Sequence, residues 1–203
     1  MARFTSLLLQ LAAFCCAASL ASAVTPTTSL TSDQLASRFL AQATFGPSPD
    51  SIAALTALNN DFSAWIDLEA AKPASSAVAL LQAARTTTPT LSYDRGTNRR
   101  ARNELMLAGS DQLRHRVAYA LSQIMVISDL DSNISDAQEG SSSYYDMLSR
   151  NALGSFRTLL VDVTRHPMMG RYLSHYKNRK ANLTTGTRPD ENYAREILQL
   201  FSI

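Results

Sequence analysis

The sequence predicts an all-α fold, a compact array of about eight to ten helices. Apolar residues recur at the i, i+3, i+4 spacing of a helix face along almost the whole chain, and the alternating pattern of β-strands is nearly absent. Capping residues and breakers divide these periodic segments into pieces near a dozen residues long, which is the usual length of a helix in a globular protein.

Caps and turns set the expected order of the helices. Ser32 or Asp33 caps the first, the Gly/Pro turn 44–49 ends it, and Asn60 caps the third. Gly154 separates two later helices. The predicted helices cover 32–43, 50–58, 61–71, 75–85, 98–108, 111–128, 144–152, 155–164, 167–173 and 189–201.

The segment 111–128 is the clearest of these, and its length and neighbours predict a central helix. Leu113, Val117, Leu121, Ile124 and Met125 form its broad apolar face, and the first four are expected to be buried. The next stretch, 129–143, is polar, low in complexity and ends in three serines, which predicts a mobile surface loop. A second loop, 176–188, is basic and polar.

The N-terminus has the pattern of a secretory signal. Arg3 is the positive region, 4–20 is the apolar core, and Ala21-Ser22-Ala23 is a small-residue cleavage site. We therefore expect residues 1–23 to be removed and the protein to be exported, to the periplasm, the cell envelope or the medium. The apolar run is short and cleavable, so we expect no stable membrane span after processing.

Charge and cysteine content exclude several functions. Of the 19 basic residues only Arg3 falls in the signal, which leaves 18 against 17 acidic residues and gives no electrostatic case for nucleic acid. Both cysteines lie in the signal, so the mature chain has no disulfide and no cysteine metal site. The arginine cluster between 95 and 102 favours a solvated helix face over an anion site.

The chain ends at Phe201-Ser202-Ile203, inside an apolar helical pattern with no cap. We therefore expect a fold that is incomplete at its C-terminus. The predicted organisation is a signal peptide over 1–23, a flexible mature N-terminus over 24–31, and a helical domain over 32–203 that is the first part of a longer one.

The start of the last helix carries the densest polar chemistry. Pro189 and two acids begin it, and Glu191, Arg195 and Glu196 occupy faces beside the apolar stripe. A buried carboxylate beside an arginine could act as a general base or anchor a substrate, and a structural network bracing the helix is the alternative that we favour. In either case, Arg195 and one of the two glutamates are expected to be buried and paired.

Two weaker candidates complete the set. His166 and His175 flank a short helix and could meet Glu191 or Glu196 in an acid–base site, although a ring at the position before Pro167 is also placed to bond a helix end. Asp129, Asp131 and Asn133 resemble the start of a calcium loop, but the turn glycine and the bidentate glutamate are missing, which favours a solvated acidic loop. The sequence contains no Gly-rich phosphate loop that would indicate a cofactor.

Six segments in order carry a family resemblance. They are RFLAQATFGP at 38–47, LRHRVAYALSQI at 113–124, YYDML at 144–148, GSFRTLL at 154–160, VTRHPMMGRYL at 163–173 and PDENYAREILQLF at 189–201. Together they resemble the bacterial domain-of-unknown-function family 1800. The resemblance implies an exported protein, longer than this chain, with no agreed activity, cofactor or catalytic residue. It also implies a possible partner, an exported sulfatase-like protein.

Two functions remain open. The first is an envelope or secreted module that binds a partner, which we favour because no segment assembles a nucleophile, a base and an orienting group. The second is an exported enzyme, of hydrolase type, with a site around Glu191, Arg195, Glu196 and His166 that further residues would complete.

Overall fold

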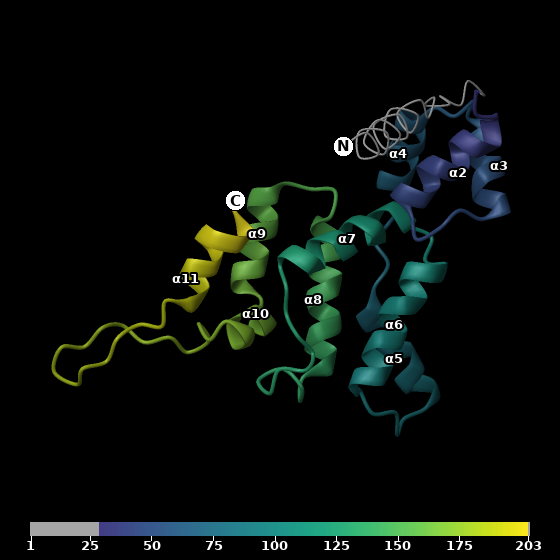
Figure 1. Ribbon diagram of the computed structural model, residues 1–203. Coiled ribbons are helices and arrows are strands. Elements are labelled where there is room, and N and C mark those ends of the chain that lie inside the picture. The colour runs from purple at the N-terminus through teal and green to yellow at the C-terminus, as the bar shows by residue number, and fades with distance from the viewer. Residues whose placement is uncertain (1–28, 203) are drawn as a thin grey trace, which may run out of the picture. The chain divides into compact units, whose positions relative to one another are not determined.

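Ten α-helices and a closing π-helical turn make up the part of the chain that the structure describes, residues 29–202 of a computed structural model (Figure 1). They are α2 (Ser32–Ala43), α3 (Pro49–Ala57), α4 (Phe62–Ala70), α5 (Ala77–Thr87), α6 (Arg95–Ala108), α7 (Gln112–Ile124), α8 (Gln138–Asn151), α9 (Phe156–Arg165), α10 (Pro167–Tyr172), α11 (Asn192–Glu196) and η1 (Ile197–Phe201). One isolated β-bridge is the only strand-like pairing in these residues. The predicted all-α array is confirmed.

Side-chain caps set several helix starts. Asp61, Ser76 and Asp94 each accept the N–H three residues on, at the beginnings of α4, α5 and α6. The prediction that Asn60 caps α4 is wrong: Asn60 has a left-handed φ of 56°, and its side chain donates to Ser32 instead. The cap at Asp94 also starts α6 three residues earlier than the apolar pattern indicated.

Three apolar clusters hold the helices together. The largest joins α7, α8, α9, α10 and the α11–η1 segment, and fully buried Met125 and Leu148 lie within it. A second cluster joins α2, α3 and α4 around Leu40 and Trp65. A third joins α5 to α6 through Leu81 and Leu105. Helix α8 packs against α5, α6, α7, α9 and α10, so it occupies the central place that the sequence assigned to α7.

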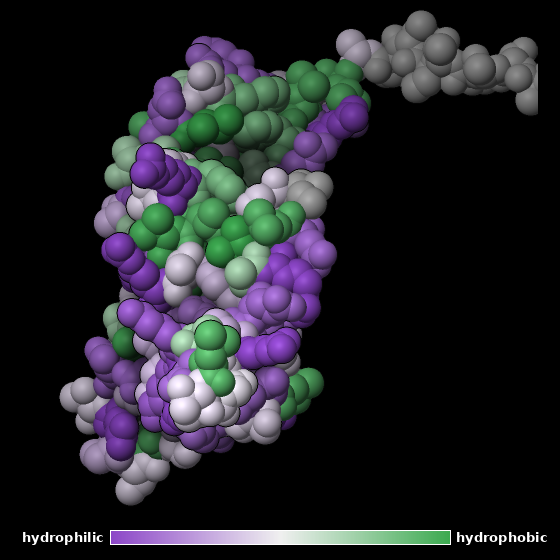
Figure 2. All heavy atoms as spheres, turned by 90° about the vertical axis from the view of Figure 1, so that its left-hand side faces the viewer, coloured by the Kyte–Doolittle hydropathy of each residue, from purple (hydrophilic) through white to green (hydrophobic). Residues whose placement is uncertain are grey.

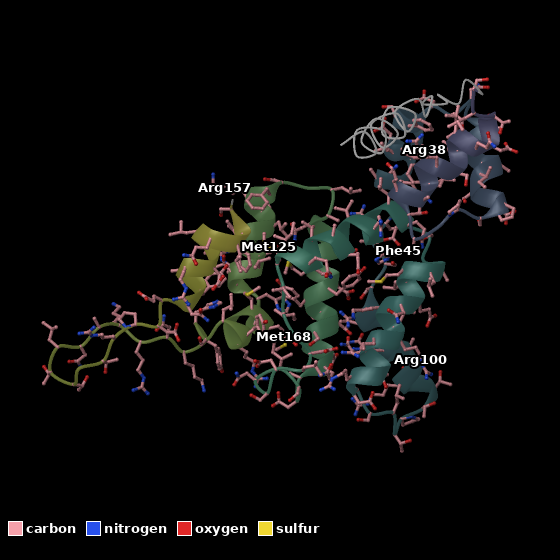
Figure 3. All side chains as sticks on the ribbon, viewed as in Figure 1. Arg38, Phe45, Arg100, Met125, Arg157 and Met168 are labelled. Atoms are coloured by element: carbon pink, nitrogen blue, oxygen red, sulfur yellow. The ribbon has the colours of Figure 1, made fainter. Side chains whose placement is uncertain are left out.

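The serine-rich end of the stretch predicted as a mobile loop, residues 138–143, is instead the first half of α8. Ser141 and Ser142 are buried, and the Ser142 hydroxyl donates to the Asn98 side chain on α6. The side chain of Met168, a residue of α10, lies against α8 (Figure 3), and a Cβ added at Gly140 would come within 2.7 Å of the Met168 sulfur. Small residues are present here because two helices approach closely, so low complexity does not indicate a loop.

Helix α7 is also rotated from its predicted orientation. Its buried residues are His115 and Ala118, followed by Met125 at its end, whereas 48% of Ile124 is exposed. Leu121 packs partly buried against the main cluster. The helix lies between α8 and the α2–α4 group, and its buried polar residues are accommodated because they have partners, described below.

The helices between residues 29 and 202 are all too short or too polar to cross a membrane. The two longest, α6 and α8, have 14 residues each, and a spanning helix needs about 20. The proposed signal peptide and most of the predicted flexible segment lie outside the described residues.

Candidate functional site

The polar start of the last helix lies at the surface. Glu191 and Arg195 are exposed, with 49% of the Arg195 side chain open to solvent, and Glu196 is half-buried. The Arg195 guanidinium donates to Asn192 Oδ1 at 2.7 Å and lies 3.9 Å from the Glu196 carboxylate. The prediction that Arg195 is buried is therefore wrong, and its partners are neighbours on its own helix.

Apolar side chains hold this helix in place. Tyr193 and Phe201 are buried, and Ile197 packs against the same cluster. The Tyr193 hydroxyl lies 2.7 Å from Thr164 Oγ1 on α9, and its ring stacks on His175 with 4.1 Å between centroids. The face with Glu191 and Arg195 stays in solvent, whereas Glu196, on the other polar face, has only 18% of its side chain exposed.

His166 forms its hydrogen bonds at the ends of helices. Its Nδ1 accepts the Met168 N–H at 3.3 Å, which caps α10, and its Nε2 lies 3.4 Å from the Ser143 hydroxyl on α8. Burial lowers the pKa of His166, so the ring is neutral at neutral pH. These bonds match the helix-end role, and none of them reaches Glu191 or Glu196.

The residues that resembled a calcium loop are used differently. The Arg99 guanidinium donates two hydrogen bonds of 2.8 Å to the Asp129 carboxylate, and these hold the pKa of Asp129 below its usual range. The Asp131 carboxylate accepts the N–H of Asn133 at 2.8 Å. Within residues 29–202, no three His, Cys, Asp or Glu side chains gather closely enough to hold a metal. The arrangement does not fit a calcium ion.

The loop 176–190, which we call the arm, projects from the helices between α10 and α11 (Figure 1). At its base, the Asn178 side chain donates to the Asp190 carbonyl at 2.7 Å and accepts the Asp190 N–H at 2.8 Å. Near its tip, the Asn182 N–H donates to the Thr187 carbonyl at 3.0 Å. The arm is therefore shaped by its own hydrogen bonds.

The outer part of the arm, 176–188, is basic and contains no acidic residue. Its cations are all exposed, and none forms a salt bridge with another described residue; they are Lys177, Arg179, Lys180 and Arg188. Leu183, at the tip, is 100% exposed. An unpaired basic surface with one apolar residue at its end is a feature suited to binding rather than to packing.

An apolar area lies next to the arm. Figure 2 shows apolar residues gathered over α11 and η1, above the hydrophilic arm. Leu198 is 70% exposed there and borders a shallow hollow with Ala194 and the stem of Arg195. The arm and this helix together form one continuous segment of chain that offers both charged and apolar groups to solvent.

A buried polar network, which no sequence motif indicated, joins α7 to the segment before α5. Asp111 and His115 are fully buried. The Asp111 carboxylate accepts the Ser75 N–H at 3.0 Å and the Ser75 hydroxyl at 2.8 Å. His115 Nε2 lies 2.6 Å from Ser75 Oγ, and its Nδ1 lies 3.3 Å from the Tyr145 hydroxyl.

This network has the residue types of a catalytic triad but not its geometry. In a triad the serine and the carboxylate bind opposite nitrogens of the histidine. Here Asp111 lies 3.1 Å from the same Nε2 that faces Ser75, and it accepts the serine proton directly. Burial opposes ionisation of Asp111, but the hydrogen bonds from Ser75 hold its pKa below the usual range. In the sequence, the signal that could have indicated this network was the i, i+4 spacing of Asp111 and His115.

These features define a class of protein, a helical domain that carries a projecting basic arm. Its sequence matches over residues 38–203 the model of a family described as "Protein of unknown function (DUF1800)", and the chain belongs to this family. No curated protein matches the chain, and no solved structure does.

Proposed function

We propose that the chain is an exported module that binds a partner protein, and that its arm docks on an acidic surface of that partner. The N-terminal pattern supports export, because a positive residue, an apolar run and the small-residue site 21–23 follow one another. One observation supports binding above all others: the arm holds its own shape while presenting four cations that form no salt bridge, and the fully exposed Leu183, to solvent.

The physical case rests on preorganisation and charge. A loop that is already shaped by hydrogen bonds loses less conformational entropy when it binds than a loose one. Unpaired cations on a projecting segment raise the association rate with an acidic surface and select against basic ones. The arm contributes no side chain to the three apolar clusters, so packing of the fold does not account for its composition.

The chemistry of the arm favours a protein partner. Four cations around a single apolar tip residue match an acidic patch with one apolar pocket. The mature chain is close to neutral overall, which gives no long-range attraction to a strongly anionic polymer. The exported sulfatase-like protein implied by the family resemblance is the first partner to test.

The hydrolase alternative has weaker support. It needs Glu191, Arg195, Glu196 and His166 to act together, but His166 bonds to Met168 and to α8, while Arg195 pairs along its own helix. In the buried network, the Ser75 hydroxyl and the Asp111 carboxylate both lie against Nε2 of His115, which is not the arrangement of a catalytic triad. The binding proposal does not require the four hydrolase candidate residues to meet, because it rests on the cations and Leu183 of the arm.

Site-specific photo-crosslinking in the exporting cell tests the proposal. A photo-reactive amino acid replaces Leu183 at the arm tip, and in a matched control it replaces Leu107, which is 78% exposed on α6. We expect a discrete protein adduct from position 183 only. Changing Lys177, Arg179, Lys180 and Arg188 to glutamine should remove that adduct while leaving the amount of folded protein unchanged.

Three outcomes would contradict the proposal. They are equal adducts from positions 183 and 107, an adduct that survives the fourfold glutamine change, and crosslinks from position 183 to lipid alone. The last would identify a membrane surface, and not a protein, as the partner of the arm.

A further inference from the structure

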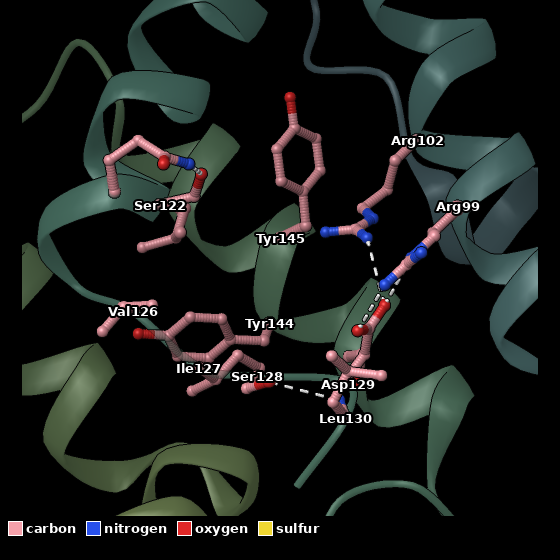
Figure 4. Close-up of a pocket in the computed structure, with 13 residues that line it drawn as sticks. Arg99, Arg102, Ser122, Val126, Ile127, Ser128, Asp129, Leu130, Tyr144 and Tyr145 are labelled. Atoms are coloured by element: carbon pink, nitrogen blue, oxygen red, sulfur yellow. Dashed lines mark hydrogen bonds and ion pairs between the residues drawn. The ribbon is translucent and has the colours of Figure 1, made fainter.

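A cleft of about 360 Å³ opens between α6, α8 and the end of α7 with the segment that follows it (Figure 4). This volume suits a small organic molecule. One wall is charged and the other is largely apolar. The residues that line the cleft are Arg99, Arg102, Ser122, Gln123, Val126, Ile127, Ser128, Asp129, Leu130, Ser141, Tyr144, Tyr145 and Leu148.

The charged wall has a guanidinium without adequate partners. Arg102 lies in the cleft with 27% of its side chain exposed, its Nε has no hydrogen-bond partner, and its Nη2 is 3.8 Å from Asp129. Arg99 takes the two close hydrogen bonds to that carboxylate. Burial lowers the pKa of Arg102, and the Asp129 carboxylate opposes that shift without cancelling it.

A second unpartnered group lies in the same cleft. Ser141 is 5% exposed, and its hydroxyl oxygen has no hydrogen-bond partner within the described chain. Buried polar groups in native proteins are nearly always paired, so two such groups in one cleft point to a ligand. Opposite the arginines, Val126, Ile127 and Tyr144 provide an apolar surface (Figure 4).

We infer that this cleft binds a small organic monoanion, with its carboxylate on Arg102 and its apolar body against Ile127, Val126 and Tyr144. The charge balance fixes the class of anion. The lining contains two arginines and one aspartate, an excess of one positive charge, and Asp129 is also 4.0 Å from Arg95 just outside the lining, so Arg102 is left without a carboxylate of its own. A guanidinium matches a carboxylate through two parallel hydrogen bonds, and the Ser141 hydroxyl can donate a third.

Calorimetric titration of the mature chain with octanoate tests this inference, with octanamide as the neutral probe of equal length and acetate as the probe without an apolar body. Octanoate should bind at least about tenfold more tightly than either, because each comparison probe loses one class of contact. Arg102→Gln should weaken octanoate binding by a similar factor. Arg100→Gln, on the exposed side of the same helix, should leave it unchanged.

The thermal melt of each variant is recorded beside the titration, and Arg99→Gln provides a second, more exposed change in case Arg102→Gln does not fold. Equal binding of octanoate and octanamide would contradict a role for the arginines. Equal binding of octanoate and acetate would contradict the apolar wall. Undiminished binding by both arginine variants, or no saturable binding of octanoate, would overturn the inference.

Discussion

Asp146 shows how one side chain can position two helices. It is 4% exposed on α8, and its carboxylate accepts the Ala77 N–H at 2.8 Å, the Val78 N–H at 3.1 Å and the Ser76 hydroxyl at 2.6 Å. These groups begin α5, so the carboxylate caps a helix far away in the sequence. An anion is favourable at that end of a helix.

Removing Asp146 should therefore be more damaging than removing a local cap. Asp146→Ala leaves two backbone donors without their acceptor and is expected to lower the free energy of unfolding by more than about 3 kcal/mol. Asp61→Ala, which removes the exposed cap of α4, should cost about 1 kcal/mol. Urea denaturation measures both, and equal losses would show that the contact between α8 and α5 contributes little.

His115, which is fully buried, and His166, which is partly buried, predict the pH dependence of stability. Burial lowers the pKa of both His115 and His166 below the ordinary value of 6.5. The unfolded chain therefore binds protons below about pH 6.5 that the folded chain does not, and stability should fall as the pH drops below that value. Chemical denaturation between pH 7.5 and pH 5 checks the sign. Stability that rises on acidification through this range would contradict the assignment of both rings as neutral in the folded chain.

At the scale of elements, α7 gives the sharpest comparison, because adjacent residues have opposite environments. Met125 is fully buried, whereas Ile124 is 48% exposed. Met125→Ala should lower the free energy of unfolding by about 2–5 kcal/mol, and Ile124→Ala by less than about 1 kcal/mol. A larger loss at Ile124 than at Met125 would contradict this account of which face of α7 is buried.

The sequence predicted helices far better than it predicted their faces. Periodicity and caps were sufficient for the number and order of the helices, because both are local properties. These local signals were not sufficient to predict the buried face of α7. Asp111 and His115 can be buried there because they bond to Ser75 and Tyr145, which lie in other elements. The start of α8 was read as a loop for a similar reason: Gly140 is required by Met168, and Ser142 is buried through its hydrogen bond to Asn98, and both partners are distant in the sequence.

The candidate site depended even more on the whole molecule. Polar faces flank the apolar stripe of the last helix, and the sequence does not say which of them meets the core. In the structure the face with Arg195 stays in solvent, whereas the face with Asn192 and Glu196 is partly buried. The arginines of α6 were read as one solvated face. Arg100 is indeed exposed, but Arg99 and Arg102 face Asp129, which lies some thirty residues away along the chain.

Export is a prediction about the whole molecule that mass spectrometry can check. Cleavage after Ala23 should leave a protein that begins Val24-Thr25-Pro26 and contains no cysteine. The intact mass of the exported protein, and its unaltered mass after treatment with a thiol reagent, are the expected results. A retained Met1, or a lipid on Cys15 or Cys16, would contradict this account of the compartment.

The central claim is that a basic arm recognises an acidic partner protein, and the most direct test is an affinity measured with purified components. The mature chain and its fourfold glutamine arm variant are titrated against the protein captured at position 183, at low salt and at about 0.2 M salt. The unmodified chain should bind at least about tenfold more tightly at low salt, and that difference should shrink as salt screens the arm. Equal affinities of the two chains at low salt would contradict the claim.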